Sequence, residues 1–303
     1  MRQFHGKYFV FSRLNKYVAV VFFKSTKSHH NLRRNLMKKI LALSSLISVV
    51  LLIFISTGVA GPVMERIVSK GHVVIGTTGT QPPLNATSKA GELIGLDVDI
   101  AKLIAMNMGV EVKFMTLPFS ELLPALIAGR VDLVISSMTI TPERNMNVAF
   151  IGPYYISGKG ILTKSKHLDA LQGASGLNQP QFKVAALKNS TSQRFVEKEA
   201  PKAEFIPVES YDQAIELLFQ DKIDVLIADS PFCALTAFRY PDKGLTAGQD
   251  RLTFEPLGIA VTEDALLINW VQNFMVSLNG RGELKRLTEK WLKDGSWTSQ
   301  LPE

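Results

Sequence analysis

The sequence predicts a two-lobe α/β protein, and three observations support that prediction. From residue 61 onward, β-branched strand-like runs alternate with helix-like segments, which is typical of α/β folds with mostly parallel sheets. The alternation occurs in two series of similar plan, each with buried strands that end in a polar turn. The chain has 303 residues, enough for two modest lobes with their own cores. We therefore expect lobe 1 to comprise residues 61–155 and 256–303, and lobe 2 residues 156–255.

The first series lies between residues 72 and 137, where apolar runs and turn residues mark the elements. It predicts strands at residues 72–77, 111–117 and 131–137, and a helix at residues 119–128. Asp97 and Asp99 begin an apolar-periodic segment that ends at Gly109, which predicts a further helix. Because a helix N-terminus is electropositive, we expect both carboxylates to cap this helix. Residues 78–90 are rich in Gly, Pro, Thr and Asn and predict a loop.

The second series repeats this rhythm between residues 183 and 292. It predicts strands at 183–188, 204–208, 223–228 and 254–261, and helices from the turn at 189–192 to about 199, at 211–220 and at 264–292, the last broken at Asn279-Gly280. Ligands of open α/β sheets lie beyond the carboxyl ends of the strands, so two such edges facing each other predict a cleft between the lobes. The chain must cross near residues 154–158 and return near residues 252–258, and these two crossings predict a hinge.

The positive charge of the chain is concentrated near its N-terminus. The net charge is +7, yet residues 1–60 hold ten Lys and Arg and no Asp or Glu. Residues 61–303 hold the other 24 Lys and Arg and all 27 Asp and Glu, which gives them a net charge of −3. We therefore expect no nucleic-acid partner, because such binding needs a basic surface.

Residues 37–60 have the pattern of a secretory signal peptide. A short positive region precedes an apolar run at residues 40–55, and small residues then lead to a cleavage site after Ala60. This pattern predicts export to the periplasm, and an uncleaved membrane anchor is the alternative. Residues 1–36 precede the signal peptide, and we interpret them as a non-native extension from a start codon assigned too early.

Cysteine and histidine usage argues against a metal or covalent chemistry. Cys233 is the single cysteine, so neither a disulfide framework nor a Cys-based metal site is expected. His72 and His167 have no partner at motif spacing, which disfavours a His-based nucleophile or metal site. We expect no cofactor and no catalytic residue.

The segment 131–144 predicts a carboxylate site. A buried strand runs into a hydroxyl-rich turn, where Ser137 and Thr139 supply hydroxyl and backbone donors. Pro142 then suits the first turn of a short helix, and Arg144 follows within that turn. A helix N-terminus and a two-pronged guanidinium both favour a carboxylate. The alternative is a solvated loop whose arginine makes a surface ion pair.

The second lobe offers a complementary set of groups. Residues 190–192 form a cluster of hydroxyl donors at a helix start, and Lys188 precedes them at a strand end. Asp229 ends a buried strand, where an unpaired carboxylate would be costly, so a ligand ammonium would pair with it. The alternative role for Asp229 is the N-cap of the next helix.

Several stretches of the chain resemble the extracellular solute-binding proteins of family 3, the polar-amino-acid receptors of ABC importers. They are GLDVDIAKLIA (95–105), FSELLPALIAGRVDLVISSMTITPER (119–144), FIGPYYISG (150–158), VAALKNSTS (184–192) and IDVLIADSP (223–231). The resemblance covers residues 65–295. It implies a type II periplasmic-binding-protein fold and a monomer without enzymatic activity. Its function would be to capture a small polar solute, an amino acid above all, and deliver it to an ABC permease in the inner membrane.

The resemblance also implies roles for individual residues. Arg144, helped by Thr139, would clamp the α-carboxylate of the ligand. Thr191 and Ser192 would donate to the same carboxylate from the other lobe, and Asp229 would take the α-ammonium.

Other positions set the side-chain preference or depart from the family. Phe119 would stack on the ligand, and Lys188 lies where some members place a lysine that senses the ligand side chain. Thr78 and Gln81 lie where many members carry an acidic residue and an aromatic, so one wall is less acidic and less aromatic. Ser137 replaces a common glycine. A carboxylate without an amine is therefore an alternative to an amino acid.

Two other functions compete with solute capture. The resemblance includes periplasmic cyclohexadienyl (prephenate or arogenate) dehydratases, for which Asp229 or Glu143 could serve as acid or base, although no paired constellation stands out. The other alternative is a ligand sensor for a membrane receptor.

Overall fold

The computed structural model describes residues 63–168, 171, 176–248 and 250–302. The predicted upstream extension and signal peptide lie outside these residues. In the described part of the chain, no helix is both long and apolar enough to cross a membrane. The residues from Pro62 to Glu303 group as one unit, which contains both lobes.

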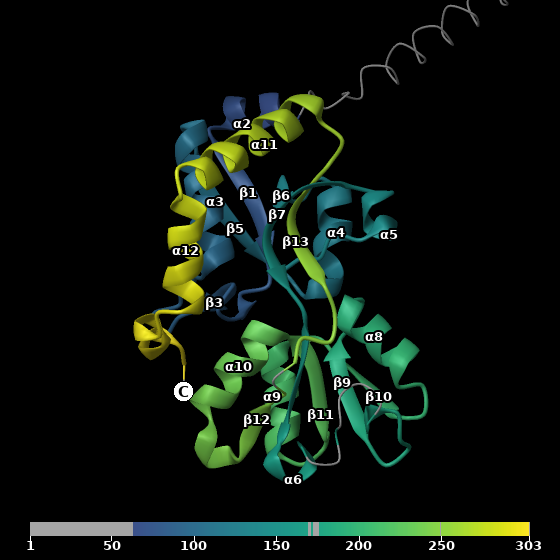
Figure 1. Ribbon diagram of the computed structural model, residues 1–303. Coiled ribbons are helices and arrows are strands. Elements are labelled where there is room, and N and C mark those ends of the chain that lie inside the picture. The colour runs from purple at the N-terminus through teal and green to yellow at the C-terminus, as the bar shows by residue number, and fades with distance from the viewer. Residues whose placement is uncertain (1–62, 169–170, 172–175, 249, 303) are drawn as a thin grey trace, which may run out of the picture. The chain divides into compact units, whose positions relative to one another are not determined.

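The first lobe is built on a five-stranded sheet with the strand order β5-β1-β6-β13-β7. The strands are β1 (His72–Thr77), β5 (Glu111–Thr116), β6 (Leu133–Val134), β7 (Ala149–Ser157) and β13 (Glu255–Val261). The helices are α2 (Val63–Lys70), α3 (Leu96–Met108), α4 (Phe119–Ile127), the short α5 (Pro142–Asn145), α11 (Ala265–Gly280) and α12 (Glu283–Leu292), followed by the 3-10 turn η2 (Ser296–Gln300) (Figure 1). A small antiparallel sheet consists of β2 (Thr80–Gln81), β3 (Asn85–Thr87) and β4 (Leu93–Ile94).

The second lobe repeats this plan with the strand order β10-β9-β11-β8-β12. The strands are β8 (Lys159–Lys164), β9 (Lys183–Leu187), β10 (Glu204–Val208), β11 (Val225–Asp229) and β12 (Leu245–Ala247). The helices are α6 (Ser165–Leu168), α8 (Thr191–Glu199), α9 (Tyr211–Phe219) and α10 (Ser230–Arg239), followed by the 3-10 turn η1 (Pro241–Lys243). This second βα series confirms the two-lobe α/β prediction.

Both sheets are mixed, whereas the sequence predicted mostly parallel ones. In the first sheet β1 pairs in parallel with β5 and β6, but β13 is antiparallel to β6 and β7. In the second, β9 is parallel to β10 and β11, but β8 is antiparallel to β11 and β12. The antiparallel strands adjoin the crossings between the lobes, where β7 continues almost directly into β8.

Element bounds follow the local signals closely except where long-range contacts intervene. β1 and β10 have the predicted bounds. β6 pairs only over Leu133–Val134, because the chain then turns through Ser137 at a φ of 49°. The helical tail breaks at Gly282, at a φ of 71°, rather than at Asn279-Gly280.

The predicted capping by Asp97 and Asp99 is wrong. Gly95 is the N-cap of α3, and no side chain makes a capping hydrogen bond there. Asp99 instead accepts from Lys290 Nζ and Trp291 Nε1, both at 2.7 Å, and so fastens α12 to α3. Asp97 turns inward to contacts described below. Both carboxylates therefore form hydrogen bonds with groups distant in the sequence and not with the backbone N–H groups of α3.

Candidate ligand-binding site

Arg144 is held in place by the start of α5. The side chain of Thr141 caps this helix by accepting a hydrogen bond from the Arg144 N–H at 3.2 Å, and Pro142 occupies the first turn. The guanidinium then folds back and donates to the Thr139 carbonyl at 2.9 Å. It also donates to the Asn189 carbonyl at 3.3 Å, which belongs to the second lobe. The arginine is therefore a bridge between the lobes rather than a solvated loop residue.

The Arg144 guanidinium is buried without a carboxylate partner. Arg144 is 7% exposed, and among the described residues no carboxylate lies within 4.0 Å of it. Its charge lies over the Phe119 ring, with 5.5 Å between Cζ and the ring centroid. Burial, followed by the like charge of Arg194, lowers the pKa of Arg144 to about 10, so it stays cationic at neutral pH. A guanidinium has five donors, and the two carbonyls leave several for an anion.

The facing wall is the N-terminus of α8. The hydroxyl of Ser190 accepts from the Gln193 N–H at 3.1 Å and donates to the Leu187 carbonyl at 2.6 Å. Ser190 is thereby committed to capping the helix. The hydroxyl of Thr191 donates to Glu255 Oε2 at 3.0 Å. Capping orients the first turn of α8 toward the other lobe.

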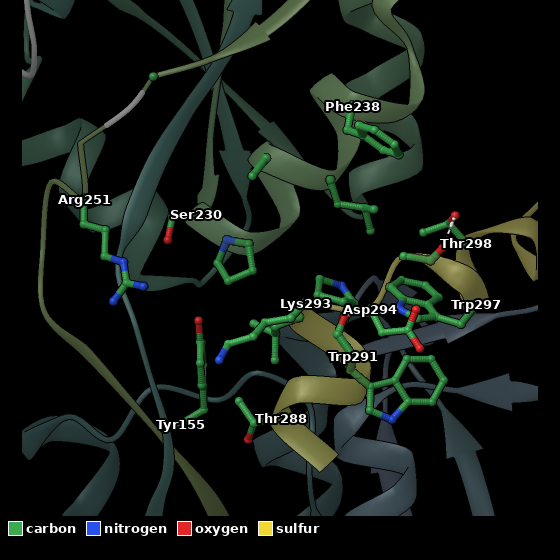
Figure 2. Close-up of a pocket in the computed structure, with 17 residues that line it drawn as sticks. Tyr155, Ser230, Phe238, Arg251, Thr288, Trp291, Lys293, Asp294, Trp297 and Thr298 are labelled. Carbon is green, nitrogen blue, oxygen red and sulfur yellow. Dashed lines mark hydrogen bonds between the residues drawn. The ribbon is translucent and has the colours of Figure 1, made fainter. Parts of the chain in front are cut away.

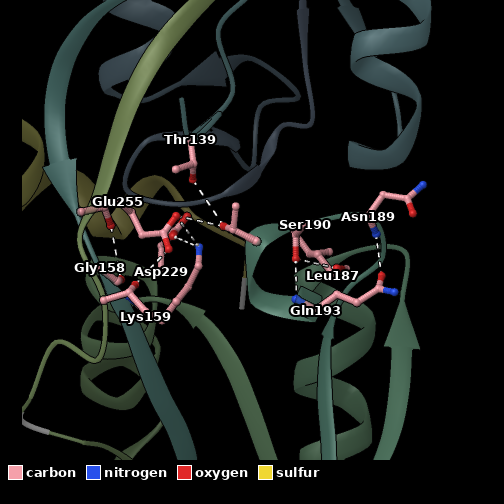
Figure 3. Close-up of polar contacts among 12 residues, drawn as sticks. Thr139, Gly158, Lys159, Leu187, Asn189, Ser190, Gln193, Asp229 and Glu255 are labelled. Atoms are coloured by element: carbon pink, nitrogen blue, oxygen red, sulfur yellow. Dashed lines mark hydrogen bonds and ion pairs between the residues drawn. The ribbon is translucent and has the colours of Figure 1, made fainter. Parts of the chain in front are cut away.

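Hydroxyl groups from the two lobes meet at this wall. Thr139 Oγ1 lies 3.4 Å from Thr191 Oγ1 (Figure 3). The hydroxyls of Ser137 and Ser192 are buried and have no hydrogen-bond partner among the described residues. Buried polar groups are normally paired, so these two orphaned hydroxyls are candidates for contacts with a bound solute.

Asp229 is paired with a lysine that the sequence reasoning missed. Lys159 Nζ lies 2.9 Å from Asp229 Oδ1 and 3.6 Å from Glu255 Oε2. Figure 3 shows the ammonium pointing toward both carboxylates. Asp229 is the N-cap residue of α10 by position, but its side chain makes no capping hydrogen bond, so the alternative role is wrong. The sequence did contain a sign of this pair, a lysine at the start of an apolar strand. A buried lysine needs an anionic partner.

Glu255 is a second buried carboxylate that the sequence reasoning missed. Burial tends to raise its pKa, but the charge of Lys159 and hydrogen bonds from Thr139, Thr253 and Thr191 outweigh burial and lower the pKa. Glu255 therefore stays ionised at neutral pH. Lys159 thus holds together the first residue of β13 and the end of β11.

Asp97 organises the loop side of the site. Its carboxylate accepts from Asn85 Nδ2 at 2.8 Å, from the Ser137 N–H at 2.9 Å and from the Tyr154 hydroxyl at 2.8 Å. Burial raises the pKa of Asp97 to about 6, although these three hydrogen bonds oppose the rise. The Ser137 turn at the end of β6 is thus fixed by a residue of α3.

The loop after β1 places its two candidate residues differently. Gln81 is buried, and its Oε1 accepts from the Ser136 hydroxyl at 3.2 Å. Thr78 points into the loop, where its hydroxyl donates to Asn85 Oδ1 at 2.7 Å. Gln81 therefore faces the site, whereas Thr78 supports the loop behind it.

The structure does not bring Lys188 to the other candidates. Its side chain is 51% exposed and its ammonium lies 3.0 Å from Glu209 Oε1. At the end of β9 this side chain points to solvent, so it does not contact the groups around Arg144 and Asp229.

All remaining candidates except Arg144 and Thr78 line one small pocket between the lobes. Its lining residues are Gln81, Phe119, Ser137, Thr139, Lys159, Leu187, Ser190, Thr191, Ser192, Tyr211 and Asp229. Arg144 adjoins this wall through its hydrogen bond to Thr139. The pocket volume is about 10 Å³, which is room for roughly one water molecule, so the lobes must separate to admit an organic solute.

A larger cavity of about 630 Å³ lies elsewhere, between α10 and the α12–η2 segment (Figure 2). Tyr155 and Arg251 line it beside the lobe crossings. A cavity of this size is a usual first candidate for a ligand site. Here its charged side chains, Arg251, Lys293 and Asp294, are exposed, whereas the small pocket has buried and oppositely charged groups. The small pocket therefore has the chemistry of a polar site. Among the described residues, no His, Cys, Asp and Glu group could hold a metal ion.

Two α/β lobes, two crossings and a polar pocket between the lobes define the class of two-lobe solute-binding proteins. The chain belongs to the bacterial extracellular solute-binding proteins, family 3, whose profile matches residues 73–294. The profile match confirms the predicted family. The named relatives are binding proteins, and they favour the binding-protein interpretation over the dehydratase alternative.

Named relatives and solved structures agree with this family. A probable amino-acid ABC transporter-binding protein of Haemophilus influenzae is 28% identical over 260 residues, 84% of this chain and 97% of that protein. The L-arginine-binding protein of Pseudomonas aeruginosa is 30% identical over 233 residues, 72% of this chain and 87% of that protein. An ancestral amino acid-binding protein, described as a precursor of cyclohexadienyl dehydratase, has a TM-score of 0.71 at 34% identity and covers 76% of this chain and 99% of its own. The fold is thus that of type II periplasmic binding proteins.

Proposed function

We propose that this protein captures a polar amino acid between its lobes and delivers it to the permease of an ABC importer. The observation that carries the proposal is the buried Arg144 cation, whose contacts among the described residues are two neutral carbonyls and an aromatic ring. A solute carboxylate would supply the missing anion and form charge-assisted hydrogen bonds. The relatives named as amino-acid binding proteins support the same solute class.

Each lobe contributes to the proposed recognition of the solute. Arg144 and Thr139 hold the α-carboxylate from lobe 1. From lobe 2 the N-terminus of α8 at Thr191 donates to it, since the Thr191 hydroxyl donates to Glu255. Asp229 accepts the α-ammonium through Oδ2, since Lys159 is bonded to Oδ1.

Other groups complete the proposed site. Phe119 packs against the solute, Gln81 forms the loop wall, and the orphaned hydroxyls of Ser137 and Ser192 make further hydrogen bonds. Thr78 acts only by supporting Gln81, and Lys188 stays outside.

Lobe closure provides the signal for transport in this proposal. The moving bodies are residues 61–155 with 256–303, and residues 156–255. A solute favours the closed form only if it gains contacts there that the open form lacks. Thr191 and Asp229 supply those contacts, because they belong to the lobe opposite Arg144.

The test is isothermal titration calorimetry of the purified protein against a panel of amino acids, with Arg144→Ala as the critical variant. Removing one partner of a buried charge pair is worth about 3 kcal/mol, so we expect affinity to fall about 100-fold or more. Arg194→Ala is the control, because Arg194 is an exposed arginine paired with Glu143, and we expect less than about a fivefold change. Equal affinity of Arg144→Ala and wild type would refute the carboxylate role.

The proposal extends to location and state. We infer a monomer without enzymatic turnover, freed into the periplasm by cleavage after Ala60. Mass spectrometry of the periplasmic fraction tests the cleavage, because the mature chain should begin at Gly61. A chain that retains residues 37–60 and fractionates with the membrane would contradict it.

A further inference from the structure

The buried ammonium of Lys159 lies in the wall of the proposed solute pocket. Lys159 is the first residue of β8, and its side chain is 3% exposed. Lys159 and Asp229 are the two charged residues among those that line the pocket. Burial alone does not call for a lysine here, because an apolar residue would fill a buried strand position at lower cost.

The charges around the pocket balance in a specific way. Arg144 and Lys159 contribute two positive charges, and Asp229 and Glu255 contribute two negative ones. These four groups at the pocket therefore sum to zero charge before a solute binds. Asp97 lies outside the lining, where three neutral donors hold its carboxylate on the loop side.

A solute changes this balance according to its side chain. A zwitterionic amino acid with a neutral side chain preserves neutrality, since its carboxylate meets Arg144 and its ammonium shares Asp229. A cationic side chain would add a buried charge with no anion left to pair, and that is energetically costly. A lysine ammonium has three N–H donors, so Lys159 can still donate one hydrogen bond to a side-chain acceptor.

We propose that Lys159 determines specificity by taking the place of a cationic solute side chain beside Asp229 and Glu255. The solute class is then a polar amino acid with a neutral, hydrogen-bond-accepting side chain, and cationic amino acids are disfavoured. This inference rests on the proposed function and deepens it. It separates this chain from relatives such as the L-arginine-binding protein of Pseudomonas aeruginosa.

The test is calorimetry at neutral pH with two probes of similar length, L-glutamine and L-lysine. Wild type should bind L-glutamine about tenfold or more tightly than L-lysine, because one uncompensated charge costs more than 1.4 kcal/mol. Lys159→Met leaves an excess negative charge, so the ratio should shift by about tenfold or more toward L-lysine. Lys164→Met is the matched control, because Lys164 lies in the same strand and pairs with Asp221, outside the pocket lining. It should keep the wild-type ratio.

A charge-compensated variant separates charge from loss of folding. Lys159→Met combined with Glu255→Gln restores neutrality, so its preference should return toward L-glutamine. Circular dichroism of each variant verifies folding, and the double variant also serves if Lys159→Met does not fold. The inference is refuted if Lys159→Met keeps the wild-type ratio of L-glutamine to L-lysine affinity. If that variant does not fold, a preference of the double variant for L-lysine refutes the inference. So does a wild-type preference for L-lysine.

These measurements also distinguish failure of the proposed function from failure of the role of Lys159. If Arg144→Ala loses binding while Lys159→Met keeps the wild-type ratio, the proposed function stands and the role of Lys159 fails. If wild type binds no amino acid of the panel, both fail.

Discussion

A single carboxylate, Asp97, joins three separate parts of the first lobe. It accepts hydrogen bonds from Asn85 in β3, from the Ser137 N–H after β6 and from the Tyr154 hydroxyl in β7. The Ser137 turn is strained for a residue other than glycine, with a φ of 49°. Asp97 therefore fixes the position of Ser137, although no local sequence pattern links the two residues. The burial of Asp97 also has a measurable consequence for stability.

Stability should depend on pH through Asp97. Burial raises its pKa in the folded state from 3.8 to about 6, so the folded protein binds this proton more tightly than the unfolded chain. This stabilisation is full below the unfolded pKa and is lost as pH rises through about 6. The difference corresponds to about 3 kcal/mol.

Asp97→Asn is the matched variant for this prediction. An asparagine keeps one acceptor for Asn85 and Ser137 and can donate to the Tyr154 oxygen instead. We expect the unfolding free energy of wild type, relative to Asp97→Asn, to fall by about 2.5 kcal/mol between about pH 4 and pH 7.5 in urea titrations. A constant difference across that range would show that Asp97 does not titrate as its burial implies.

The short helix α5 shows how an element of four residues can position a candidate ligand-binding side chain, Arg144. The Thr141 hydroxyl caps it through the Arg144 N–H, and Pro142 occupies the first turn. The sequence predicted this helix from Pro142 and its hydroxyl-rich entry. It could not predict that the guanidinium turns toward Asn189, because that carbonyl belongs to the other lobe.

Removal of the cap should affect both folding and binding. Thr141→Ala leaves the Arg144 N–H without its acceptor, so we expect a stability loss of about 1 kcal/mol. The loosened α5 should also weaken solute binding by about fivefold. Thr141→Ser retains the cap and should restore both quantities. Full affinity in Thr141→Ala, measured by calorimetry, would show that the cap does not position Arg144.

At the scale of the whole molecule, the two lobes meet through a few polar contacts and shared apolar packing. Thr139 faces Thr191 at 3.4 Å, and Glu143 pairs with Arg194 at 2.8 Å. One cluster of buried apolar side chains includes Phe119 from the first lobe and Tyr211 from the second. Exposed ion pairs contribute little, so closure depends on the buried contacts around the pocket.

A cross-lobe disulfide should arrest exchange of the solute. Thr139→Cys combined with Thr191→Cys places two thiols at the meeting point of the lobes. Oxidation should slow solute uptake and release by about 100-fold or more, because a pocket of about 10 Å³ admits no organic solute without lobe separation. Reduction should restore the rates of the double variant, measured by stopped-flow fluorescence. Unchanged rates after complete oxidation would mean that entry needs no opening.

Much of the fold was predictable because its signals are local. Buried β-branched runs mark strands such as β1, and glycine or hydroxyl residues mark helix ends such as those of α3 and α8. The strands β7, β8 and β12 were missed because their identity depends on pairing with distant strands. Asp97 was assigned to a cap for the same reason, since its true partners lie far along the chain.

The candidate site likewise contains residues that local signals predicted and residues that they did not. Arg144, Thr139, Thr191 and Asp229 were found from residue type at strand and helix ends, together with a family resemblance. Lys159 and Glu255 were not, because a single charged residue in a strand is uninformative until its partners are known. Lys188, chosen from its place at a strand end and from the resemblance, lies on the surface with Glu209.

The sequence by itself determined the two-lobe α/β plan, the family and the placement of an arginine beside a hydroxyl turn. These properties depend on local periodicity, turn chemistry and short motifs, which any segment carries within itself. Only the tertiary structure decided which charges meet. Asp229 and Glu255 share Lys159 across 70 and 96 residues of sequence, and such pairing depends on the strand order in space. The proposed choice of solute rests on that pairing.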